Sequence, residues 1–346
     1  MRHLDEDMLL TVNDLKVGFR TLSGTAWAVD GLSFAVDRGQ ILAIVGESGS
    51  GKTAATLAIL GLHGGSAEIA GSIRLDDTEI VAAAPETMRQ LRGNRISMIF
   101  QDPLTAMHPY HRVGEQIVEA YRAHDRSRRG VAVARTLETL DRVGIPDPRR
   151  CFAAFPHELS GGMRQRAMIA MALVRSPDLI VADEPTTALD VTIQAQILEL
   201  LDSLRKEFGT AIVLITHDLG VVAEVASGVV VMYAGKAVEM GGVAEVFQRP
   251  QHPYTRGLLD SIPRLDRSRN PLRSIPGAPP QIAARPPGCR FHPRCAERNR
   301  VANSLCERRE PMLARTPAGH AAACHLVSSE VRSAAGDPQP GSGAVR

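Results

Sequence analysis

The sequence predicts an α/β fold whose core is a parallel β-sheet covered on both faces, with antiparallel strands before it and a loop-rich region after it. Three apolar runs carry this prediction, at residues 41–45, 179–182 and 211–215. These runs are too continuously apolar to alternate with polar residues, which is typical of strands buried between two layers of helices. Helical patterns separate the runs, so strands and helices alternate along the chain.

The composition describes an ordinary globular chain. The 346 residues suffice for one large domain with an appendage, or for two domains. Lys and Arg number 40 against 38 Asp and Glu, a net charge of +2, so no strong positive field indicates a nucleic-acid partner. No apolar run approaches the roughly 20 residues that span a bilayer, and residues 1–7 lack the apolar core of a signal peptide. We expect a cytoplasmic protein that reaches a membrane only through a partner.

Residues 9–45 contain short runs that alternate apolar and polar side chains, which predicts antiparallel strands leading into the buried strand at 41–45. The next stretch, Gly46–Thr53, matches the phosphate-binding pattern G-x-x-x-x-G-K-[ST], and a helical pattern follows at 54–62. Strand, loop and helix in this order place backbone N–H groups and a helix N-terminus around a phosphate. The residues expected to hold the nucleotide are Gly46, Ser48, Gly49, Ser50, Gly51, Lys52, which reaches the β- and γ-phosphates, and Thr53, whose hydroxyl binds Mg²⁺.

Two aromatic residues in the N-terminal strands are candidates to stack on the adenine ring. Phe19 is the preferred one and Trp27 the second, with a place in the core as the alternative for each. From about Glu86 to Pro156 the pattern becomes helical. Within this region a strand-like segment ends at Gln101, which we interpret as the boundary between the sheet and a helical insertion.

A second pair of motifs completes a nucleotide-hydrolysing site. The apolar strand at 179–182 ends in Asp183 and Glu184, where Asp183 is expected to hold Mg²⁺ and Glu184 to orient or deprotonate the attacking water. Two carboxylates at the end of such an apolar strand are costly to bury without a cation. Ser160, Gly161 and Gly162 predict a capped helix N-terminus, which is a second phosphate-binding surface. Such a surface is explained if two chains meet head to tail, each offering it to the other's nucleotide.

In this order the motifs resemble the ATP-binding subunits of ABC transporters over roughly residues 8–250. The resemblance rests on the phosphate loop, Gln101, Leu159–Arg166, Asp183–Glu184, Ala188-Leu189-Asp190 and His217. It implies that Gln101 contacts Mg²⁺ and the attacking water, that Asp190 communicates across the dimer, and that His217 contacts the γ-phosphate. Met163 departs from the glutamine that is commonest in the wider family, as in the peptide-importer branch.

Three further segments are similar to the ATPase subunits of oligopeptide/dipeptide importers, a group that includes nickel importers: Gln101–Pro109, His252–Arg256 and Pro276–Pro280. This likeness divides the chain into a nucleotide-binding domain at 1–250 with a helical subdomain at about 86–160, an extension at 251–327 and a tail at 328–346 that we expect to be disordered. It implies two transmembrane permease subunits, a second and homologous ATPase subunit, an extracellular substrate-binding protein and a place at the cytoplasmic face of the membrane. The cargo is not identified by the sequence.

Four of the five cysteines crowd near the C-terminus, at Cys289, Cys295, Cys306 and Cys324. In a reducing cytoplasm this favours a metal site over disulfides. The spacing lacks a C-x₂-C knuckle, and in the importer family it resembles an iron–sulfur site of the [4Fe–4S] type, with zinc and then unligated thiols as alternatives. We expect Arg290, Arg294 and Arg298 to offset the cluster's negative charge, and Cys151 to have no role.

The sequence disfavours two functions other than ATP-driven import. A soluble ABC ATPase acting on nucleic acid or ribosomes is disfavoured, because such proteins usually carry two cassettes and this chain has one phosphate loop and one signature. The arginines after residue 264 also have almost no interleaved aromatic residues for stacking on bases, with Phe291 as the exception. A degenerate cassette that only binds ATP is disfavoured by the presence of Glu184.

Overall fold

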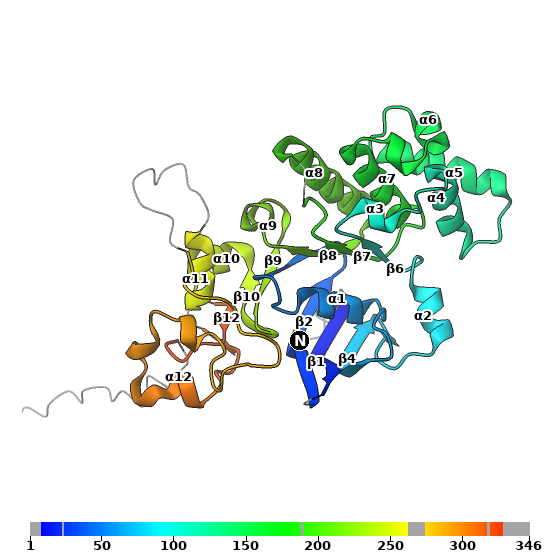
Figure 1. The fold of residues 1–346 in the computed structure, drawn as a ribbon. Coiled ribbons are helices and arrows are strands. Elements are labelled where there is room, and N and C mark those ends of the chain that lie inside the picture. The colour runs from blue at the N-terminus through cyan, green and yellow to red at the C-terminus, as the bar shows by residue number, and fades with distance from the viewer. Residues whose placement is uncertain (1–7, 23, 188–189, 262–273, 317–318, 328–346) are drawn as a thin grey trace, which may run out of the picture.

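The structure is a computed structural model, and it describes residues 8–22, 24–187, 190–261, 274–316 and 319–327. The predicted disordered tail and the Ala188-Leu189 pair lie outside the described residues. The strands are β1 (Met8–Thr21), β2 (Gly24–Asp37), β3 (Ile41–Val45), β4 (Ala67–Leu75), β5 (Thr78–Glu79), β6 (Ile96–Ile99), β7 (Leu179–Asp183), β8 (Ala211–Thr216), β9 (Gly228–Tyr233), β10 (Lys236–Gly242), β11 (Ala314–Arg315) and β12 (Ala321–Ala322) (Figure 1).

The helices are α1 (Lys52–Ile59), α2 (Pro85–Leu91), α3 (Pro103–Ala106), α4 (Val113–Arg122), α5 (Arg129–Arg142), α6 (Pro148–Ala153), α7 (Gly161–Leu173), α8 (Val191–Phe208), α9 (Leu219–Val225), α10 (Val243–Gln248), α11 (Pro253–Asp260) and α12 (Leu305–Arg308). Short 3₁₀ turns lie at Pro156–Glu158, His292–Arg294, Arg298–Arg300 and Ala302–Ser304. Among the described residues, no helix combines the length and apolar character needed to cross a bilayer.

The central sheet has the strand order β11-β12-β10-β9-β3-β8-β7-β6 in the described residues. Its middle is parallel, from β6 through β7, β8 and β3 to β9, as the apolar runs predicted. Side chains on these strands alternate between two faces, and both faces are buried. Ile44 packs in the core that includes the N-terminal strands, whereas Ala43 packs in the core beneath α9, α10 and α11. This two-sided burial explains why the runs carry no polar alternation.

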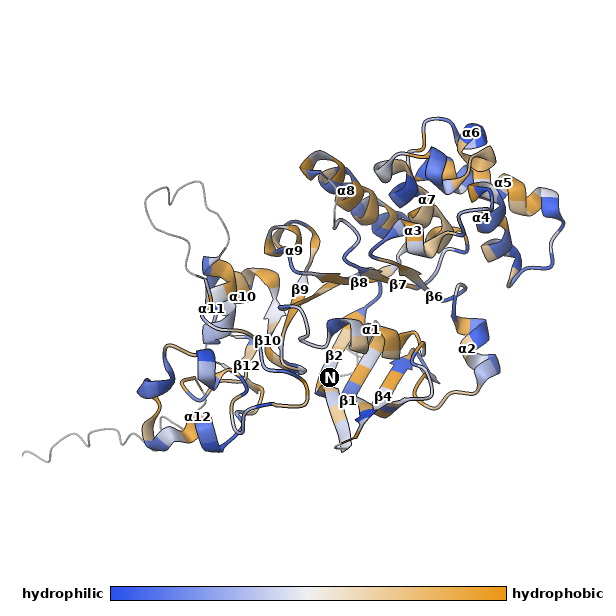
Figure 2. Cartoon of the chain, in the orientation of Figure 1, coloured by the Kyte–Doolittle hydropathy of each residue, from blue (hydrophilic) through white to orange (hydrophobic). Residues whose placement is uncertain are grey.

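The N-terminal residues form a second, antiparallel sheet of order β2-β1-β4-β5, which confirms the strands predicted at 9–45. Helix α1 lies between the two sheets (Figure 1). Figure 2 shows apolar residues gathered on the central strands and on α1, and more polar residues on the outer helices α5 and α6. The fold therefore has the α/β core and the antiparallel subdomain that the sequence predicted.

The helical insertion begins later than the predicted position near Glu86. Strand β6 belongs to the central sheet, where it pairs with β7. Met88 and Leu91 of α2 are buried in the core of the antiparallel sheet rather than among the helices of the insertion. The helices that pack on one another therefore begin at α3. A helical pattern identified α2 but gave no information about the sheet it packs on.

The extension contributes two strands that the sequence analysis missed. Strand β12 pairs with β10, and β11 pairs with β12, so the end of the chain extends the edge of the central sheet. Each strand has two residues and neither carries an alternating apolar pattern, which explains why no signal was found. The extension lies at the opposite end of the molecule from the helical insertion (Figure 1).

Candidate nucleotide site

Three neighbouring parallel strands bring the predicted site residues to one edge of the central sheet. Val45 at the end of β3 is level with Thr216 of β8, and Asp183 at the end of β7 is level with Ile215. The loops that follow these strands therefore meet around a cavity of about 640 Å³. Its lining consists of Phe19, Ala28, Ser48, Gly49, Ser50, Gly51, Lys52, Thr53, Ala54, Gln101, Asp183, Glu184, Thr187, His217 and Ile282.

The phosphate loop is held in a conformation that requires glycine at two positions. Gly51 has φ 102°, and a Cβ there would lie 2.6 Å from the carbonyl oxygen of Ala28. A Cβ on Gly46 would lie 2.2 Å from the carbonyl oxygen of Met232. Both contacts are far shorter than a carbon and an oxygen tolerate, so only glycine allows the loop to pack this closely.

The loop has the donors that a phosphate needs. Helix α1 begins at Lys52, inside the phosphate-binding motif, and Lys52 and Thr53 of its first turn line the cavity. The Ser50 hydroxyl is buried and has no hydrogen-bond partner in the described residues. The Lys52 ammonium donates to the carbonyl oxygens of Gly46 and Glu47, at 2.7 and 3.1 Å. A buried hydroxyl without a partner and a desolvated ammonium fit an anionic ligand.

The residues that line the cavity also fit a hard divalent cation. Thr53 carries a hydroxyl oxygen, Gln101 an amide oxygen and Asp183 a carboxylate. Mg²⁺ prefers oxygen ligands of these types. Burial and the neighbouring charge of Glu184 raise the pKa of Asp183, and the charge of Lys52 opposes this rise. Burial conversely lowers the pKa of Lys52, against the charges of Glu184 and Asp183. A bound cation would relieve the repulsion between the two carboxylates.

Glu184 is the residue on which the predicted catalytic side chains converge. Its Oε1 lies 3.0 Å from Nδ1 of His217, and its Oε2 accepts hydrogen bonds from Gln101 Nε2 and Thr187 Oγ1, each at 2.9 Å. Burial raises the pKa of Glu184, but hydrogen bonds from His217 and Thr187 with the charges of His217 and Lys52 hold it below the ordinary value. The carboxylate is therefore ionised at neutral pH. Its backbone has φ 46°, a strained conformation of the kind found at functional sites.

Of the two aromatic candidates for stacking on adenine, one lines the cavity. Phe19 lines it and meets His63 edge-on at 5.8 Å, whereas Trp27 is not among the lining residues. Ile282 of the extension also lines the cavity and is not among the predicted site residues. Thr187 was missed as well. Neither belongs to a motif, and Ile282 lies 229 positions after Thr53 in a proline-rich loop, so no local signal was available.

The remaining predicted nucleotide residues lie away from this cavity. Ser160 is exposed and caps α7, accepting a hydrogen bond from Met163 N at 3.3 Å, while Gly161 has open space around it. Gly162 packs near Ile193 of α8. Asp190 is exposed and caps α8 by accepting from Ile193 N at 3.0 Å. Both helix N-termini therefore point to surroundings other than this chain's own phosphate loop.

The four C-terminal cysteines come together, as their crowding in the sequence suggested. Cys289, Cys295, Cys306 and Cys324 line one small cavity. The described residues nevertheless contain no set of three or more His, Cys, Asp or Glu side chains placed to bind one metal ion. The predicted metal cluster is therefore not supported by this geometry. As thiols, these side chains pack as small apolar groups, and Cys289 and Cys295 adjoin the core beneath α10 and α11.

Burial raises the pKa of Cys289 to about 12 and that of Cys324 to about 11, so both are neutral thiols at pH 7 in this arrangement. Two of the three arginines predicted to offset a cluster's charge form ion pairs with carboxylates on other elements. Arg290 pairs with Asp30 and Arg294 pairs with Glu47 of the phosphate loop. Of the three arginines, Arg298 acts electrostatically on a cysteine, lowering the pKa of Cys295 against the effect of its burial. Cys151 is fully buried in the core.

Comparison with known families finds two matching models along the chain. A family model described as ABC transporter matches residues 29–187. A model described as Oligopeptide/dipeptide transporter, C-terminal region, matches residues 238–301. Among solved structures, cbiO1 from Clostridium perfringens, part of the ABC transporter complex cbiONQ, is 28% identical, with a TM-score of 0.60, over 70% of this chain and 92% of that one.

Curated relatives are similar along nearly the whole chain. The oligopeptide transport ATP-binding protein OppD of Salmonella typhimurium is 47% identical over 325 residues, which cover 94% of this chain and 96% of the relative. The OppD protein of Escherichia coli is also 47% identical, over 94% of this chain and 95% of that one. The likeness thus includes the extension as well as the nucleotide-binding core.

Gly51→Ala is expected to weaken binding of Mg-ATP about tenfold or more, because the new Cβ would meet the Ala28 carbonyl and the residue would keep a left-handed backbone. Gly64→Ala is the matched control, since a Cβ at Gly64 meets nothing within 4 Å. Titration calorimetry checks both variants. Equal affinities for Gly51→Ala and the parent would contradict the tight packing described for the loop.

Proposed function

This chain belongs to the family of oligopeptide transport ATP-binding proteins, the ATPase subunits of ABC transporters, and from this premise we propose that it drives peptide uptake by hydrolysing ATP at the phosphate-loop cavity. One observation carries the proposal. The ionised Glu184 carboxylate lies at the edge of that cavity between Gln101 and His217. A carboxylate held in this way is suited to accept a proton from, or to orient, an attacking water.

Each group around the cavity has a defined part in this chemistry. The loop N–H groups and the Ser50 hydroxyl bind the β- and γ-phosphates, and Lys52 leaves its present carbonyl partners to reach them. Thr53, Gln101 and Asp183 would hold Mg²⁺, which when bound neutralises charge on the phosphate oxygens. Gln101 and His217 fix the direction of the Glu184 carboxylate, so that the water it orients lies in line with the γ-phosphorus. Phe19 supplies a stacking face for adenine.

The second phosphate-binding surface belongs to a neighbouring nucleotide in this proposal. Ser160 begins α7 with exposed donors and does not line the chain's own cavity. A head-to-tail pair of ATPase subunits would place it against the γ-phosphate held by the partner, with Asp190 nearby to sense closure. We propose that the second ATPase is a homologous chain. The pair would lie at the cytoplasmic face of the membrane beneath two permease subunits, served by an extracellular substrate-binding protein.

Transmission to the permease would use the helical insertion. Gln101 follows β6 of the sheet and precedes α3, so it connects the catalytic edge to the first helix of the insertion. Leu104 on α3 and Tyr110 after it are large apolar residues exposed to solvent. We propose that a helix of the permease packs on them. Closure of the ATPase pair would then move the transmembrane segments.

Glu184→Gln is expected to reduce ATP turnover by about 100-fold or more while leaving Mg-ATP binding intact, because the amide cannot accept the proton of the attacking water. Turnover is measured by phosphate release and binding by calorimetry. Glu224→Gln on α9 is the control, since Glu224 is exposed and distant from the cavity lining. Turnover by Glu184→Gln at the parental rate would contradict the proposed role.

We further propose that the four C-terminal cysteines bind a metal cluster of the [4Fe–4S] type, with zinc as the alternative. Their convergence on one cavity supports the proposal. Binding would require the neutral thiols to lose their protons and to move toward a common centre. His292 and His325 line the same cavity and are the alternative ligands. One ring nitrogen of each contacts a backbone carbonyl oxygen, of Cys289 and Arg309, as the second nitrogen of a metal-bound imidazole commonly does.

Protein purified without oxygen is expected to contain about four iron atoms and to absorb in the visible range, because four thiolates suffice for one such cluster. Cys306→Ser should lose most of the iron, and Cys151→Ala, the buried control, should keep it. Iron, sulfide and zinc analyses with an absorption spectrum check this. A colourless protein with one zinc supports the alternative ligand, and metal-free protein contradicts both.

A further inference from the structure

Glu47, the second residue of the phosphate loop, is held by the part of the chain beyond residue 250. Its backbone N–H donates to the hydroxyl oxygen of Tyr254 at 2.9 Å. Its carboxylate accepts two hydrogen bonds from Arg294, from Nη1 to Oε2 at 2.6 Å and from Nη2 to Oε1 at 3.0 Å. This two-point pair joins residues that are 247 positions apart. The extension therefore contacts both the main chain and the side chain of Glu47 in the loop.

Contacts other than the one to Glu47 also hold the Arg294 side chain in place. Its side chain is only 6% exposed, and its Nε donates to the carbonyl oxygen of Pro276 at 2.8 Å. The guanidinium also lies over the ring of Tyr233, 5.8 Å from its centre. A guanidinium with its rotamer set in this way loses little entropy when it binds a carboxylate.

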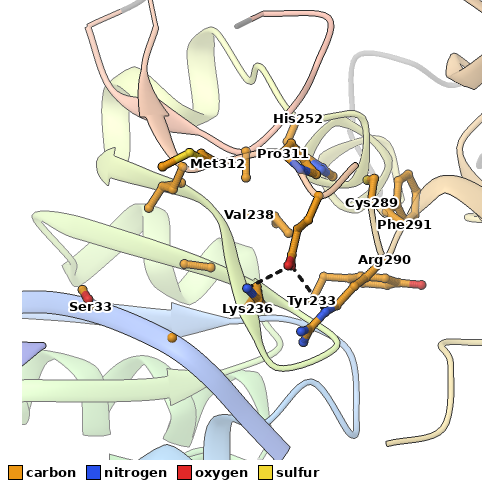
Figure 3. Close-up of a pocket in the computed structure, with 15 residues that line it drawn as sticks. Ser33, Tyr233, Lys236, Val238, His252, Cys289, Arg290, Phe291, Pro311 and Met312 are labelled. Carbon is orange, nitrogen blue, oxygen red and sulfur yellow. Dashed lines mark ion pairs between the residues drawn. The ribbon is translucent and has the colours of Figure 1, made fainter. Parts of the chain in front are cut away.

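An aromatic cluster supports this arginine. Tyr233, Tyr254 and Phe291 contact one another with ring centres 4.7 to 5.4 Å apart. Figure 3 shows Tyr233 and Phe291 at the wall of an adjoining cavity, where Lys236 and Arg290 pair with Glu310. The neighbouring basic residues thus have carboxylate partners of their own. Arg294 pairs instead with Glu47 of the phosphate loop.

The position of Glu47 creates an electrostatic problem for a loop that binds phosphates. A carboxylate on the loop repels an incoming triphosphate unless a cation compensates it, and the repulsion is strong where water is partly excluded. Arg294 compensates this charge, and its fork also fixes the direction of the carboxylate. With Tyr254 holding the N–H of the same residue, the start of the loop is fixed before nucleotide arrives.

We propose that Arg294 is a positioning residue for the phosphate loop, acting through Glu47 to set the affinity for ATP. This inference rests on the proposed binding of ATP at the loop. It assigns the extension a part in the nucleotide site, in addition to any metal-binding role of its cysteines. Arg294 itself does not line the nucleotide cavity, so its effect must pass through Glu47.

The test is a set of binding measurements with Mg-ATP on the full chain and its variants, together with unfolding midpoints measured without nucleotide. Arg294→Gln is expected to weaken binding about tenfold, which is the scale of one lost charged hydrogen-bond pair. Arg294→Lys should fall between this variant and the parent, because lysine keeps the charge but not the fork. Arg300→Gln is the matched control, since Arg300 pairs with Glu297 on the surface of the same extension.

The double variant of Arg294→Gln and Glu47→Gln distinguishes a positioning role of Arg294 from a contribution of Arg294 to the stability of the whole fold. If Arg294 acts through Glu47, the double variant should bind ATP better than Arg294→Gln alone, because the uncompensated carboxylate is gone. The inference is overturned if Arg294→Gln binds like the parent, or if the double variant binds no better and both unfolding midpoints fall together. A different outcome would contradict the proposed function of the loop: the parent fails to bind Mg-ATP, and Lys52→Ala shows the same lack of binding. If Arg294→Gln does not fold, the comparison of Arg294→Lys with and without Glu47→Gln gives the same decision.

Discussion

The register of three buried strands is the constraint on which the site depends. β3, β8 and β7 are parallel and adjacent, and their carboxyl ends stop within one residue of each other, at Val45, Thr216 and Asp183. Because each strand is buried on both faces, a shift in register would disturb the close packing of its side chains in two cores at once. Hydrophobic packing of the strands therefore brings the phosphate loop, the two carboxylates and His217 to one edge, where hydrogen bonds such as that between His217 and Glu184 then orient the side chains. The polar edge is a consequence of the apolar interior.

The charged side chains at this edge of the central sheet do not fully compensate one another. Lys52 lies near the carboxylates of Asp183 and Glu184, burial lowers its pKa, and the same burial raises the pKa of Asp183. Each group is less stable as an ion here than in water, and a triphosphate with its cation would compensate both. Glu47 is the exception, because Arg294 compensates its charge from outside the cavity. The core of the fold thus supplies the reacting groups, while the extension supplies part of the support for the loop that receives the nucleotide.

The sequence predicted the central strands and the motif residues because both signals are local. Apolar runs identify buried strands, and the glycines of the phosphate loop are required by its backbone, as the contacts around Gly46 and Gly51 show. The pairing of Arg294 with Glu47 could not be predicted, since nothing near either residue in the sequence refers to the other. Arg290 and Arg294 were assigned to the cysteines because they are neighbours in sequence, but long side chains reach partners on other elements. The strands β11 and β12 were missed for a related reason, because pairing with β10 defines them more than composition does.

The central claim is that the loop at Gly46–Thr53 receives the phosphates of ATP at the edge where Glu184 lies. An experimental structure of Glu184→Gln with Mg-ATP tests it most directly. The account predicts that the β- and γ-phosphates accept hydrogen bonds from the loop N–H groups, and that the Lys52 ammonium has left the carbonyl oxygen of Gly46, now 2.7 Å away, to contact them. It also predicts residue 184 beside the γ-phosphate. A triphosphate bound outside the loop, with Lys52 still on Gly46, would contradict the account.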